Sequence, residues 1–495
     1  MAYLGLDIGT SGVKAIVISD SGEILTQKYV EYDQRFPRKG WVEILPLDTW
    51  NATKQAIRAV AAAGEEIEAI AAASFGESAV ILDGDGNPLC SSIYYTDVRG
   101  SDMLDDIRNN VDVDALQLRT GMPLNYMYTL PKLLWINKYH PEILDQAKHI
   151  LLFGAYIQYM LTGKAVIDRS LASRSLLYNR IGDCWDREVC EVFGIDTALL
   201  PEILPAGERI GTIKKALAQE LGLASDTVVV SGVHDQVAAA LGMGVFHPGE
   251  IADGIGSSEC FTVPLPENPD YSEMFSHNYC AEPYVQKGSF VTLAFLSTAG
   301  SILKWYRETF VPDLAEKCRN ENRNIFDILN SALTEKPSPL LLLPYFSGSG
   351  TPYMDGNAKA MIYGLSLNTS RQDIYQAIYE GMNFELCLNL ELLKKSGFEA
   401  KIISAGGGGA SLEALKMKSS ILQMPIWKLR SRQTGVTGLA MLCMKALGRT
   451  ECLETAAEQL VKKEMLIEPN LKYASEYSEK YEQFKQMYNA SRRII

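Results

Sequence analysis

Two glycine-rich bends between apolar runs constrain the fold of this chain more than any other feature. The first bend, DIGTSG at residues 7–12, separates the apolar runs 3–6 and 13–18, which are predicted strands. The second bend, GIGSS at residues 254–258, again separates two strand-like segments. Small residues between short apolar runs are typical of tight β-hairpins. Two matching hairpins indicate two related domains, and a chance match of a few small residues is the competing explanation.

The chemistry of these bends suits a phosphate chain that carries a metal ion. Glycines let backbone N–H groups approach a ligand closely, and successive N–H groups in a turn form a concave anion site. Thr10 and Ser11 add hydroxyl donors, Lys14 adds positive charge, and the carboxylate of Asp7 suits a hydrated Mg²⁺. The second bend has Gly254 in place of Asp7, as expected if one carboxylate serves one metal ion. A β-meander with an ordinary turn explains the same residues without a ligand.

Composition excludes several classes of function. The chain has 495 residues, 47% of them apolar, so it is long enough for two domains with large cores. Its net charge of -13 argues against a nucleic-acid partner, because such binding requires Lys and Arg to neutralise phosphates. No apolar stretch approaches the ~20 residues of a membrane span, and the strand pattern from Tyr3 leaves no room for a signal peptide. The scattered cysteines favour reduced thiols in a cytoplasmic protein.

A run of glycines marks a third candidate ligand site. Residues 406–409 follow a strand-like segment, 400–405, and precede a helical pattern over 412–422. This order is typical of a ligand at a helix N-terminus. The chain contains no G-x-x-x-x-G-K-[ST], which excludes a P-loop NTPase. The run also lacks G-x-G-x-x-G spacing, so a dinucleotide-binding fold is only the alternative interpretation.

The sequence VVVSGVHDQVAAALGM contains the candidate catalytic group. Residues 228–230 form a short predicted strand, residues 231–234 turn the chain, and Asp235 opens an alanine-rich helix. A carboxylate at a helix start is commonly a cap that the helix dipole favours. A carboxylate can equally act as the general base for an attacking hydroxyl. His234 is interpreted as a turn residue.

Several segments resemble the FGGY family of carbohydrate kinases, within the superfamily of actin, hexokinase and the heat-shock ATPases. The carboxy-terminal family signature is present as AMIYGLSLNTSRQDIYQAIYE at residues 360–380. The amino-terminal signature is present, slightly imperfect, as MYTLPKLLWINKY at residues 127–139. The first bend, in the context DIGTSGVKAIVISDSGE, resembles the first phosphate motif of the superfamily. The resemblance covers nearly the whole chain, and within the family the sequence is most similar in general to xylulokinases.

The resemblance implies an α/β fold of two ribonuclease H-like (actin-like ATPase) domains. Each is expected to be a mixed five-stranded sheet flanked by helices, with the active site in the cleft between the domains. Residues 1–243 are the expected sugar-binding domain with the catalytic base, and residues 244–495 the expected nucleotide-binding domain. The implied cofactors are ATP and Mg²⁺, the ion being held through water by Asp7. The ATP-binding residues carried over by position are Gly9, Thr10, Ser11, Lys14, Gly256, Ser257, Gly300, Gly406, Gly407 and Ser411.

In the resembled family the aspartate of a G-x-x-D turn is the catalytic base, and Asp235 occupies that place. Substrate contacts map to residues 75–78, where xylulokinases usually carry Gln-Met-His-Gly and glycerol kinases Gln-Arg-Glu-Thr. This chain carries Phe-Gly-Glu-Ser. Its Glu77 can accept hydrogen bonds from hydroxyls but repels an acid, which favours a neutral ketose or polyol. A solvated hairpin residue is the competing interpretation of Glu77. The predicted substrate-binding residues are Gly76, Glu77, Ser78, Asp97, Arg99, Asp235 and Gln236.

Two further positions bear on the acceptor. Asp97 and Arg99 resemble the family's Trp-x-Asp-x-Arg pattern near the sugar, and either an ion pair in the pocket wall or direct hydroxyl contacts would explain them. Met127 occupies the place of a tyrosine that glycerol kinases use, which argues against glycerol. The family does not depend on a histidine at position 234.

The predicted activity is ATP-dependent phosphorylation of a neutral sugar or polyol hydroxyl, with a ketose such as D-xylulose as acceptor and Asp235 as the base for direct in-line transfer. The alternatives are a kinase of another polyol or a sugar acid (glycerol, erythritol, gluconate), a non-catalytic sugar or nucleotide sensor, and an ATPase of the actin or chaperone type. We expect small-molecule partners only, in the cytoplasm, without nucleic acid or membrane, and leave a homodimer open.

Overall fold

The computed structural model describes residues 1–493 and forms two compact units. Unit 1 contains Met1–Gly244, Cys280–Phe290 and Thr434–Val461, and unit 2 contains Val245–Tyr279, Val291–Gln433 and the described residues from Lys462 onward. The expected boundary after residue 243 lies beside the end of the first long segment. The structure differs from the expected division at residues 280–290 and 434–461, which return to unit 1. This division depends on contacts between segments that are distant in the chain, and such contacts cannot be predicted from a local sequence pattern.

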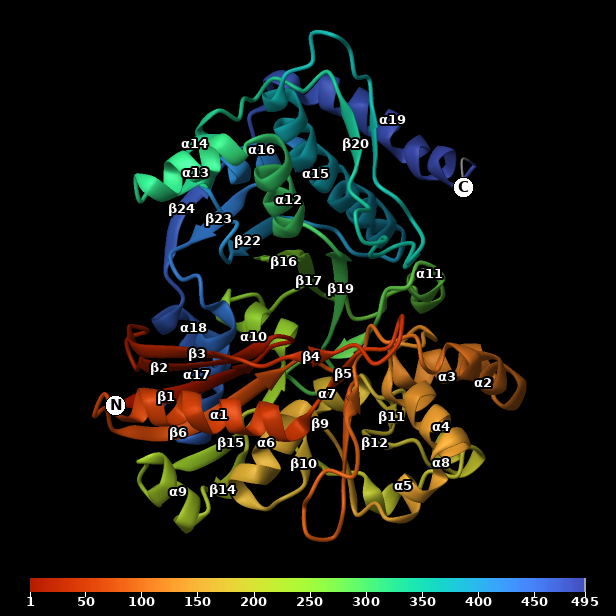
Figure 1. Ribbon diagram of the computed structural model, residues 1–495, viewed down its shortest axis with the longest axis vertical. Coiled ribbons are helices and arrows are strands. Elements are labelled where there is room, and N and C mark those ends of the chain that lie inside the picture. Colours follow the sequence, from red (N-terminus) through yellow and green to blue (C-terminus); the bar gives the residue numbers. More distant parts are fainter. Residues whose placement is uncertain (494–495) are drawn as a thin grey trace. The chain divides into compact units, whose positions relative to one another are not determined.

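A six-stranded mixed sheet with the order β14-β15-β6-β1-β2-β3 forms the centre of unit 1 (Figure 1). The predicted hairpin is confirmed, because β1 pairs antiparallel with β2 on one side and parallel with β6 on the other. The sixth strand, β14, adds antiparallel to β15 at the edge of the five strands that the resemblance implied. The strands are β1 (Ala2–Ile8), β2 (Gly12–Ser19), β3 (Ile24–Glu31), β6 (Ile67–Ser74), β14 (Arg209–Thr212) and β15 (Val228–His234).

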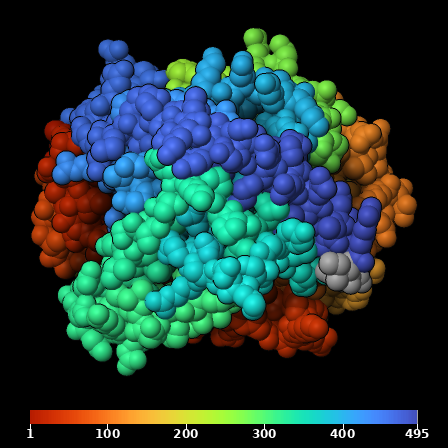
Figure 2. All heavy atoms as spheres, turned by 90° about the horizontal axis from the view of Figure 1, so that it is seen from above, coloured from red at the N-terminus to blue at the C-terminus, as the bar shows by residue number. Residues whose placement is uncertain are grey.

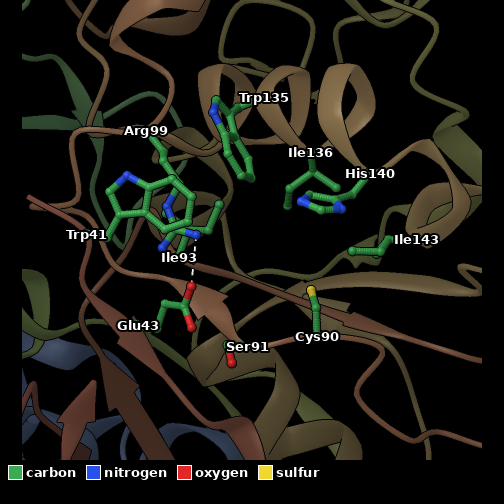
Figure 3. A pocket seen from close by; sticks show the side chains of 10 residues that line it. All are labelled: Trp41, Glu43, Cys90, Ser91, Ile93, Arg99, Trp135, Ile136, His140 and Ile143. Carbon is green, nitrogen blue, oxygen red and sulfur yellow. Dashed lines mark hydrogen bonds and ion pairs between the residues drawn. The ribbon is translucent and has the colours of Figure 1, made fainter. Parts of the chain in front are cut away.

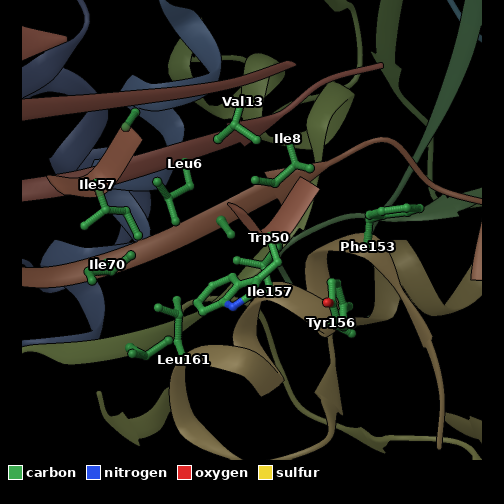
Figure 4. Packing of buried hydrophobic residues seen from close by; sticks show 14 of the residues in the cluster. Leu6, Ile8, Val13, Trp50, Ile57, Ile70, Phe153, Tyr156, Ile157 and Leu161 are labelled. Carbon is green, nitrogen blue, oxygen red and sulfur yellow. The ribbon is translucent and has the colours of Figure 1, made fainter. Parts of the chain in front are cut away.

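Helices cover both faces of this sheet, and for this reason β1 is apolar and buried along almost its whole length. Leu4, Leu6 and Ile8 belong to a core cluster with residues of α1 (Pro46–Ala61) and α6 (Phe153–Thr162). Figure 4 shows Leu6, Ile8 and Val13 of the hairpin beside Trp50, Ile57 and Ile157 of these helices. Each such side chain contributes roughly 1.5–3 kcal/mol by leaving water. This core fixes the position of the first bend.

The opposite face of the sheet is covered by α10 (Asp235–Gly242) and α17 (Thr434–Ala446). A Cβ placed on Gly5 of β1 would lie 2.7 Å from Val436 Cγ1, so glycine lets α17 approach the strand. The two helices also approach each other through glycine. A Cβ on Gly438 would lie 2.1 Å from the Ala238 carbonyl oxygen, and one on Gly242 would lie 1.7 Å from the Thr434 carbonyl oxygen.

The remaining elements of unit 1 are short and surround the sheet. The other helices are α2 (Leu104–Asn110), α3 (Val113–Thr120), α4 (Thr129–Tyr139), α5 (Pro141–Asp145), α7 (Arg169–Ser173), α8 (Arg187–Val192), α9 (Lys215–Leu221) and α18 (Leu453–Leu460). The other strands are β4 (Gln34–Arg35), β5 (Glu43–Ile44), β7 (Ala79–Leu82), β8 (Ser92–Ile93), β9 (His149–Leu152), β10 (Val166–Ile167), β11 (Tyr178–Asn179), β12 (Cys184–Trp185), β13 (Glu202–Ile203) and β18 (Glu282–Pro283). Two 3-10 turns cover Ser101–Met103 and Thr197–Leu199.

Unit 2 repeats the topology of unit 1, with the strand order β19-β17-β16-β22-β23-β24. The second predicted hairpin is confirmed as the antiparallel pair β16 and β17, and β16 pairs parallel with β22 as β1 does with β6. The match between Asp7 and Gly254 also holds, because each precedes the last residue pair before its bend. The strands of unit 2 are β16 (Glu250–Ile255), β17 (Glu259–Pro264), β19 (Phe290–Leu296), β20 (Leu341–Leu343), β21 (Met361–Tyr363), β22 (Ile402–Gly406), β23 (Ile426–Leu429) and β24 (Lys463–Ile467).

Helices of different lengths complete unit 2. Helix α15 (Arg371–Lys395) begins with a capping box between Ser370 and Asp373. Helix α19 (Ala474–Arg492) packs against α15 and α16, and Figure 2 shows it in blue along the face of this unit. Within residues 1–493 no helix is both long and apolar enough to cross a bilayer. The other helices are α11 (Tyr271–Ser276), α12 (Gly300–Phe310), α13 (Pro312–Asn320), α14 (Ile325–Ser331) and α16 (Leu412–Leu422), with a 3-10 turn at Leu471–Tyr473.

Candidate active site

The bend between β1 and β2 is a compact turn with outward donors. The Gly9 N–H donates to the Gly12 carbonyl at 3.0 Å, which closes the turn. Gly12 requires glycine, because a Cβ there would lie 2.6 Å from the Val30 carbonyl oxygen. The N–H groups of Thr10 and Ser11 donate to no acceptor within residues 1–493. These two donors suit an anion, in line with the predicted phosphate contact.

Asp7 lies on the same sheet face as α10, opposite Lys14 in the register of the hairpin. Burial, together with the negative charge of Asp235, raises the pKa of Asp7 to about 6. A cation near these carboxylates would relieve that repulsion, so the donor set fits the predicted Mg²⁺. Residues 1–493 contain no cluster of three acidic, His or Cys side chains that could enclose a metal. Mg²⁺ commonly keeps most of its waters and needs only one or two carboxylates.

The second bend brings three predicted nucleotide-binding residues together within unit 2. The Gly300 N–H donates to the Gly256 carbonyl at 3.0 Å, and the Ala299 N–H donates to the Ser257 carbonyl at 2.8 Å. A Cβ on Gly300 would lie 2.5 Å from the Gly256 carbonyl oxygen. The N-terminus of α12 is therefore fixed against the bend, and only glycine at position 300 permits it.

The glycine run at the end of β22 lies against the same bend. Gly406 is the register partner of Gly254, and a Cβ on Gly407 would lie 2.4 Å from the Ile255 carbonyl oxygen. Gly407 also has a φ of 103°, which L side chains rarely adopt. Ser411 caps α16 by accepting a hydrogen bond from the Ala414 N–H at 3.3 Å, and it also accepts one from the Asn330 amide at 3.0 Å. The cap explains Ser411 without a ligand, so its predicted contact with ATP stays a prediction.

A buried ionic triad beneath the second bend was not predicted. Lys418 of α16 donates to the carboxylates of Asp253 and Glu259, which flank the bend in β16 and β17. Burial raises the pKa of Asp253 to about 8, although the positive charge of Lys418 opposes this shift. The triad ties α16 to both strands of the hairpin. The spacing of Asp253 and Glu259 around the glycines was visible in the sequence, but Lys418 is distant along the chain.

Asp235 begins α10 directly after β15. Its Oδ1 is buried, and within residues 1–493 no group donates a hydrogen bond to it. The Nε2 of His234 lies 3.3 Å from this oxygen, at ion-pair distance but without hydrogen-bond geometry. Burial raises the pKa of Asp235 above its usual range, the charge of Glu77 adds to this shift, and His234 opposes it. A buried acceptor without a donor is rare in folded proteins and indicates a place for a ligand hydroxyl.

His234 corrects the sequence interpretation of a turn residue. Residues 231–234 remain within β15, where the register with β6 shifts between Val230 and Val233. At this irregularity a Cβ on Gly232 would lie 1.7 Å from the Ala72 carbonyl oxygen. The bulge turns the His234 side chain inward, where its Nδ1 lies 2.8 Å from Glu282 Oε1. Burial favours the neutral imidazole, but the carboxylates of Glu282 and Asp235 outweigh burial and raise the pKa of His234 to about 9.

Glu77 is not a solvated hairpin residue, because its side chain is 4% exposed and meets a buried arginine. Arg174, which follows α7, donates from Nε to Glu77 Oε1 at 2.7 Å and from Nη1 to Glu282 Oε2 at 3.2 Å. Sequence reasoning missed both Arg174 and Glu282. Arg174 lies in the segment VIDRSLASRSLLYN at residues 166–179, which resembles the family but was given no role, and Glu282 lies in no such segment.

The other predicted acceptor residues differ in their surroundings. Asp97 and Arg99 form a buried ion pair at 2.6 Å, which favours a structural role in the wall over free hydroxyl contacts. Ser78 is buried, and its Oγ has no hydrogen-bond partner within residues 1–493. Gln236 follows Asp235 in the first turn of α10 and is half-buried.

Arg99 also lines a cavity of about 260 Å³ in unit 1. Figure 3 shows its side chain beside Trp41, with Trp135 on the far side and Glu43 below. The Arg99 Cζ lies 4.0 Å from the Trp41 ring centre, and Nη1 lies 2.8 Å from Glu43 Oε1. The guanidinium is therefore satisfied by carboxylates and aromatic faces, and it holds the cavity wall.

Comparison with known proteins defines the class of this fold and site. Residues 2–242 match the model of the N-terminal domain of the FGGY family of carbohydrate kinases, and residues 254–447 match its C-terminal domain. The chain belongs to the FGGY family of carbohydrate kinases and is an ATP-dependent sugar kinase.

The named relatives act on different acceptors. A xylulose kinase of Lactococcus lactis subsp. lactis (strain IL1403) is 28% identical, with 100% of this chain and 98% of the relative covered. A gluconokinase of Bacillus subtilis (strain 168) is 25% identical, with 92% of this chain and 90% of the relative covered. The crystal structure of a ligand-bound xylulose kinase from Lactobacillus acidophilus superposes with a TM-score of 0.89 at 24% identity, over 99% of this chain and 98% of that chain. This last likeness concerns the fold.

Proposed function

We propose that this kinase transfers the γ-phosphoryl group of ATP to a hydroxyl of a neutral ketose, with D-xylulose as the first acceptor to test. The observation that carries the proposal is the Oδ1 of Asp235 at the start of α10, which is buried and accepts no hydrogen bond from residues 1–493, although the side chain as a whole is 31% exposed. A sugar hydroxyl that donates to this oxygen would satisfy it and would lose its proton to it during transfer. The raised pKa of Asp235 brings its basicity closer to neutral pH, which suits a general base.

The charges near Asp235 support a neutral acceptor. Arg174 already pairs with Glu77 and Glu282, and His234 already contacts Glu282. Lys132, also buried, donates to the Met127 carbonyl at 2.7 Å, and burial lowers its pKa to about 7. No strong positive charge within this group is left over for a carboxylate such as that of gluconate. Glu77 and Asp235 would repel it.

The phosphate side of the proposal uses the two bends. The free N–H groups of Thr10 and Ser11 in unit 1, and the glycines 256, 300, 406 and 407 in unit 2, are the proposed donors and close-approach positions. Asp7 is proposed to hold Mg²⁺ through water, and this ion would neutralise charge on the phosphates. Lys14 adds positive charge on the neighbouring strand. We propose that the enzyme acts in the cytoplasm, where ATP is available, and a homodimer stays a prediction.

The decisive experiment compares Asp235→Asn with the wild type in an acceptor-dependent ADP-release assay. We expect kcat to fall by about 10²–10⁴, the usual contribution of a general base, while ATP affinity is retained. Asp112→Asn is the matched control, because Asp112 also sits at a helix start in unit 1 but caps α3 with ordinary hydrogen bonds. Unchanged activity of Asp235→Asn would contradict the assignment of the base.

An acceptor panel of ketoses, polyols and aldonates separates the remaining possibilities. Activity with a neutral ketose and none with gluconate is the expected result. Gluconate as the best acceptor would overturn the charge argument. ADP release without any acceptor would instead indicate an ATPase, and acceptor binding without turnover would indicate a sensor.

A further inference from the structure

The side chain of Arg174 occupies the space where a side chain at position 76 would lie. A Cβ on Gly76 would lie 2.7 Å from Arg174 Cγ and 2.9 Å from its Cβ. Gly76 has an ordinary φ, so space and not backbone conformation requires glycine here. The absence of a side chain at position 76 therefore lets the arginine from the end of α7 reach the acceptor residues.

The guanidinium of Arg174 lies between two buried carboxylates, at one end of a chain of alternating charges. Arg174 is 5% exposed and contacts Glu77 on one side and Glu282 on the other. The ring of Tyr128 lies against the guanidinium, with the Arg174 Cζ 5.2 Å from its centre. Both carboxylates are thereby oriented by one rigid, forked cation, which a point charge such as lysine does not reproduce.

The chain continues from Glu282 to Asp235. Glu282 Oε1 lies 2.8 Å from His234 Nδ1, and His234 Nε2 lies 3.3 Å from Asp235 Oδ1. The order of charges is thus carboxylate, guanidinium, carboxylate, imidazole, carboxylate. Burial makes the first four members dependent on their neighbours, because removal of one partner leaves an uncompensated charge in a low-dielectric surrounding. The Asp235 side chain at the end of the chain is 31% exposed. The segment that supplies Glu282, residues 280–290, belongs to unit 1 together with all the other members.

We propose that Arg174 is a positioning and specificity-determining residue that fixes Glu77 for acceptor recognition and, through Glu282 and His234, fixes Asp235 relative to Glu77. This inference rests on the proposed function, since it assigns Glu77 and Asp235 to one acceptor. Arg174 itself touches neither a reacting atom nor the phosphates. Arg174 sets the distance between Glu77, the group that recognises the acceptor, and Asp235, the group that takes the proton.

The test replaces Arg174 by Lys, which keeps the charge and removes the fork. We expect the KM for the acceptor to rise at least tenfold, the KM for ATP to stay within twofold, and the ranking of ketoses and polyols in the panel to change. Arg169→Lys is the matched control, because Arg169 is the first residue of α7, the helix that Arg174 follows. Arg169 donates from Nε and Nη2 to Asp183 at 2.7 and 2.8 Å, so this control loses a comparable fork away from the acceptor residues.

A second variant covers the case in which Arg174→Lys fails to fold. Gly76→Ala leaves every charge in place and displaces only the stem of Arg174. It should also raise the KM for the acceptor, and the double variant Gly76→Ala/Arg174→Lys should show less than the product of the two single effects, since both act on one contact.

The outcomes distinguish the two proposals. If the wild type turns over a neutral acceptor and both single variants keep its KM and the acceptor ranking, the role of Arg174 is wrong while the proposed function stands. A loss of thermal stability with unchanged acceptor kinetics also rules out the role of Arg174, because it indicates a structural contribution only. If the wild type neither binds nor phosphorylates any member of the panel by calorimetry and assay, the proposed function is wrong and the role of Arg174 falls with it.

Discussion

At position 235, one carboxylate oxygen is held in a buried place without a hydrogen-bond donor, next to an imidazole at ion-pair distance. The imidazole of His234 is positively charged at neutral pH, because Glu282 and Asp235 overcome the effect of burial and raise its pKa to about 9. The cation opposes the shift that burial imposes on the pKa of Asp235. The proposed base is thus subject to two opposing effects: desolvation favours its protonated form, and the charge of His234 favours its ionised form.

Replacement of His234 by Asn tests this balance. Without the cation the pKa of Asp235 rises further, so the acid limb of the profile of kcat against pH should move to higher pH. At neutral pH we expect a fall of roughly tenfold, equivalent to about 1.4 kcal/mol. His140→Asn serves as the control, since the His140 side chain is 51% exposed. A shift of the acid limb to lower pH, or no shift, would refute the proposed electrostatic role of His234.

Single residues also show where sequence reasoning stops. The departure at Gly76 and Glu77 was visible in the sequence, but the sequence left open whether Glu77 is buried or solvated. The pairing with Arg174 could not be predicted, because it depends on the end of α7 reaching a loop 97 positions away in the chain. The sequence predicts His234 in a turn, because residues 231–234 lie between a short strand and a helix and the resembled family does not depend on a histidine there. In the structure these residues remain within β15, and the glycine among them makes close contact with β6.

At the scale of elements, the position of α10 depends on its packing against α17. Both helices use glycine where they meet, so the helix that starts with Asp235 is located by the contact at Gly438. Helix α16 and the two hairpins were predicted with nearly the observed bounds, because strand period, turn residues and caps are local signals. The match of the two hairpins was likewise readable from the sequence, because Ile8-Gly9 and Ile255-Gly256 are each followed by two small hydroxyl residues.

Gly438→Ala should destabilise unit 1 by about 2 kcal/mol or more, since the added methyl group would overlap the carbonyl of Ala238 and force the helices apart. Gly435→Ala in the same helix is the matched control. Nothing lies within 4 Å of a Cβ at position 435, and alanine favours the helix by up to about 1 kcal/mol. Urea denaturation followed by circular dichroism measures both. Equal stability of the two variants would disprove the close-packing argument.

At the scale of the whole molecule, the same sheet topology occurs twice and carries different chemistry. The hairpin of unit 1 carries Asp7, the proposed magnesium ligand, whereas the hairpin of unit 2 carries Gly254 at the same register position and has the ionic triad of Asp253, Glu259 and Lys418. The duplication was predictable from the repeated bends. It was not predictable that residues 280–290 and 434–461 belong to unit 1. No local sequence pattern indicates that a segment packs with an earlier part of the chain.

Metal removal tests the difference between the two hairpins. Chelation with EDTA should abolish acceptor-dependent ADP release, and excess Mg²⁺ should restore it. Asp7→Asn should need more Mg²⁺ for half-maximal activity, because its carboxylate is proposed to hold the hydrated ion. Asp20→Asn, at the other end of the same hairpin, should behave like the wild type. Full activity in EDTA would rule out the magnesium assignment.

Because α17 belongs to unit 1, that unit is still incomplete when residues 1–244 have been synthesised on the ribosome. Residues 1–244 emerge first, but the sheet face that α17 covers stays bare until nearly two hundred further residues have been translated. Unit 2 begins within that interval and is likewise completed only by its last segment. Neither unit can finish folding before the chain beyond residue 433 has been made, so the two units do not mature one after the other.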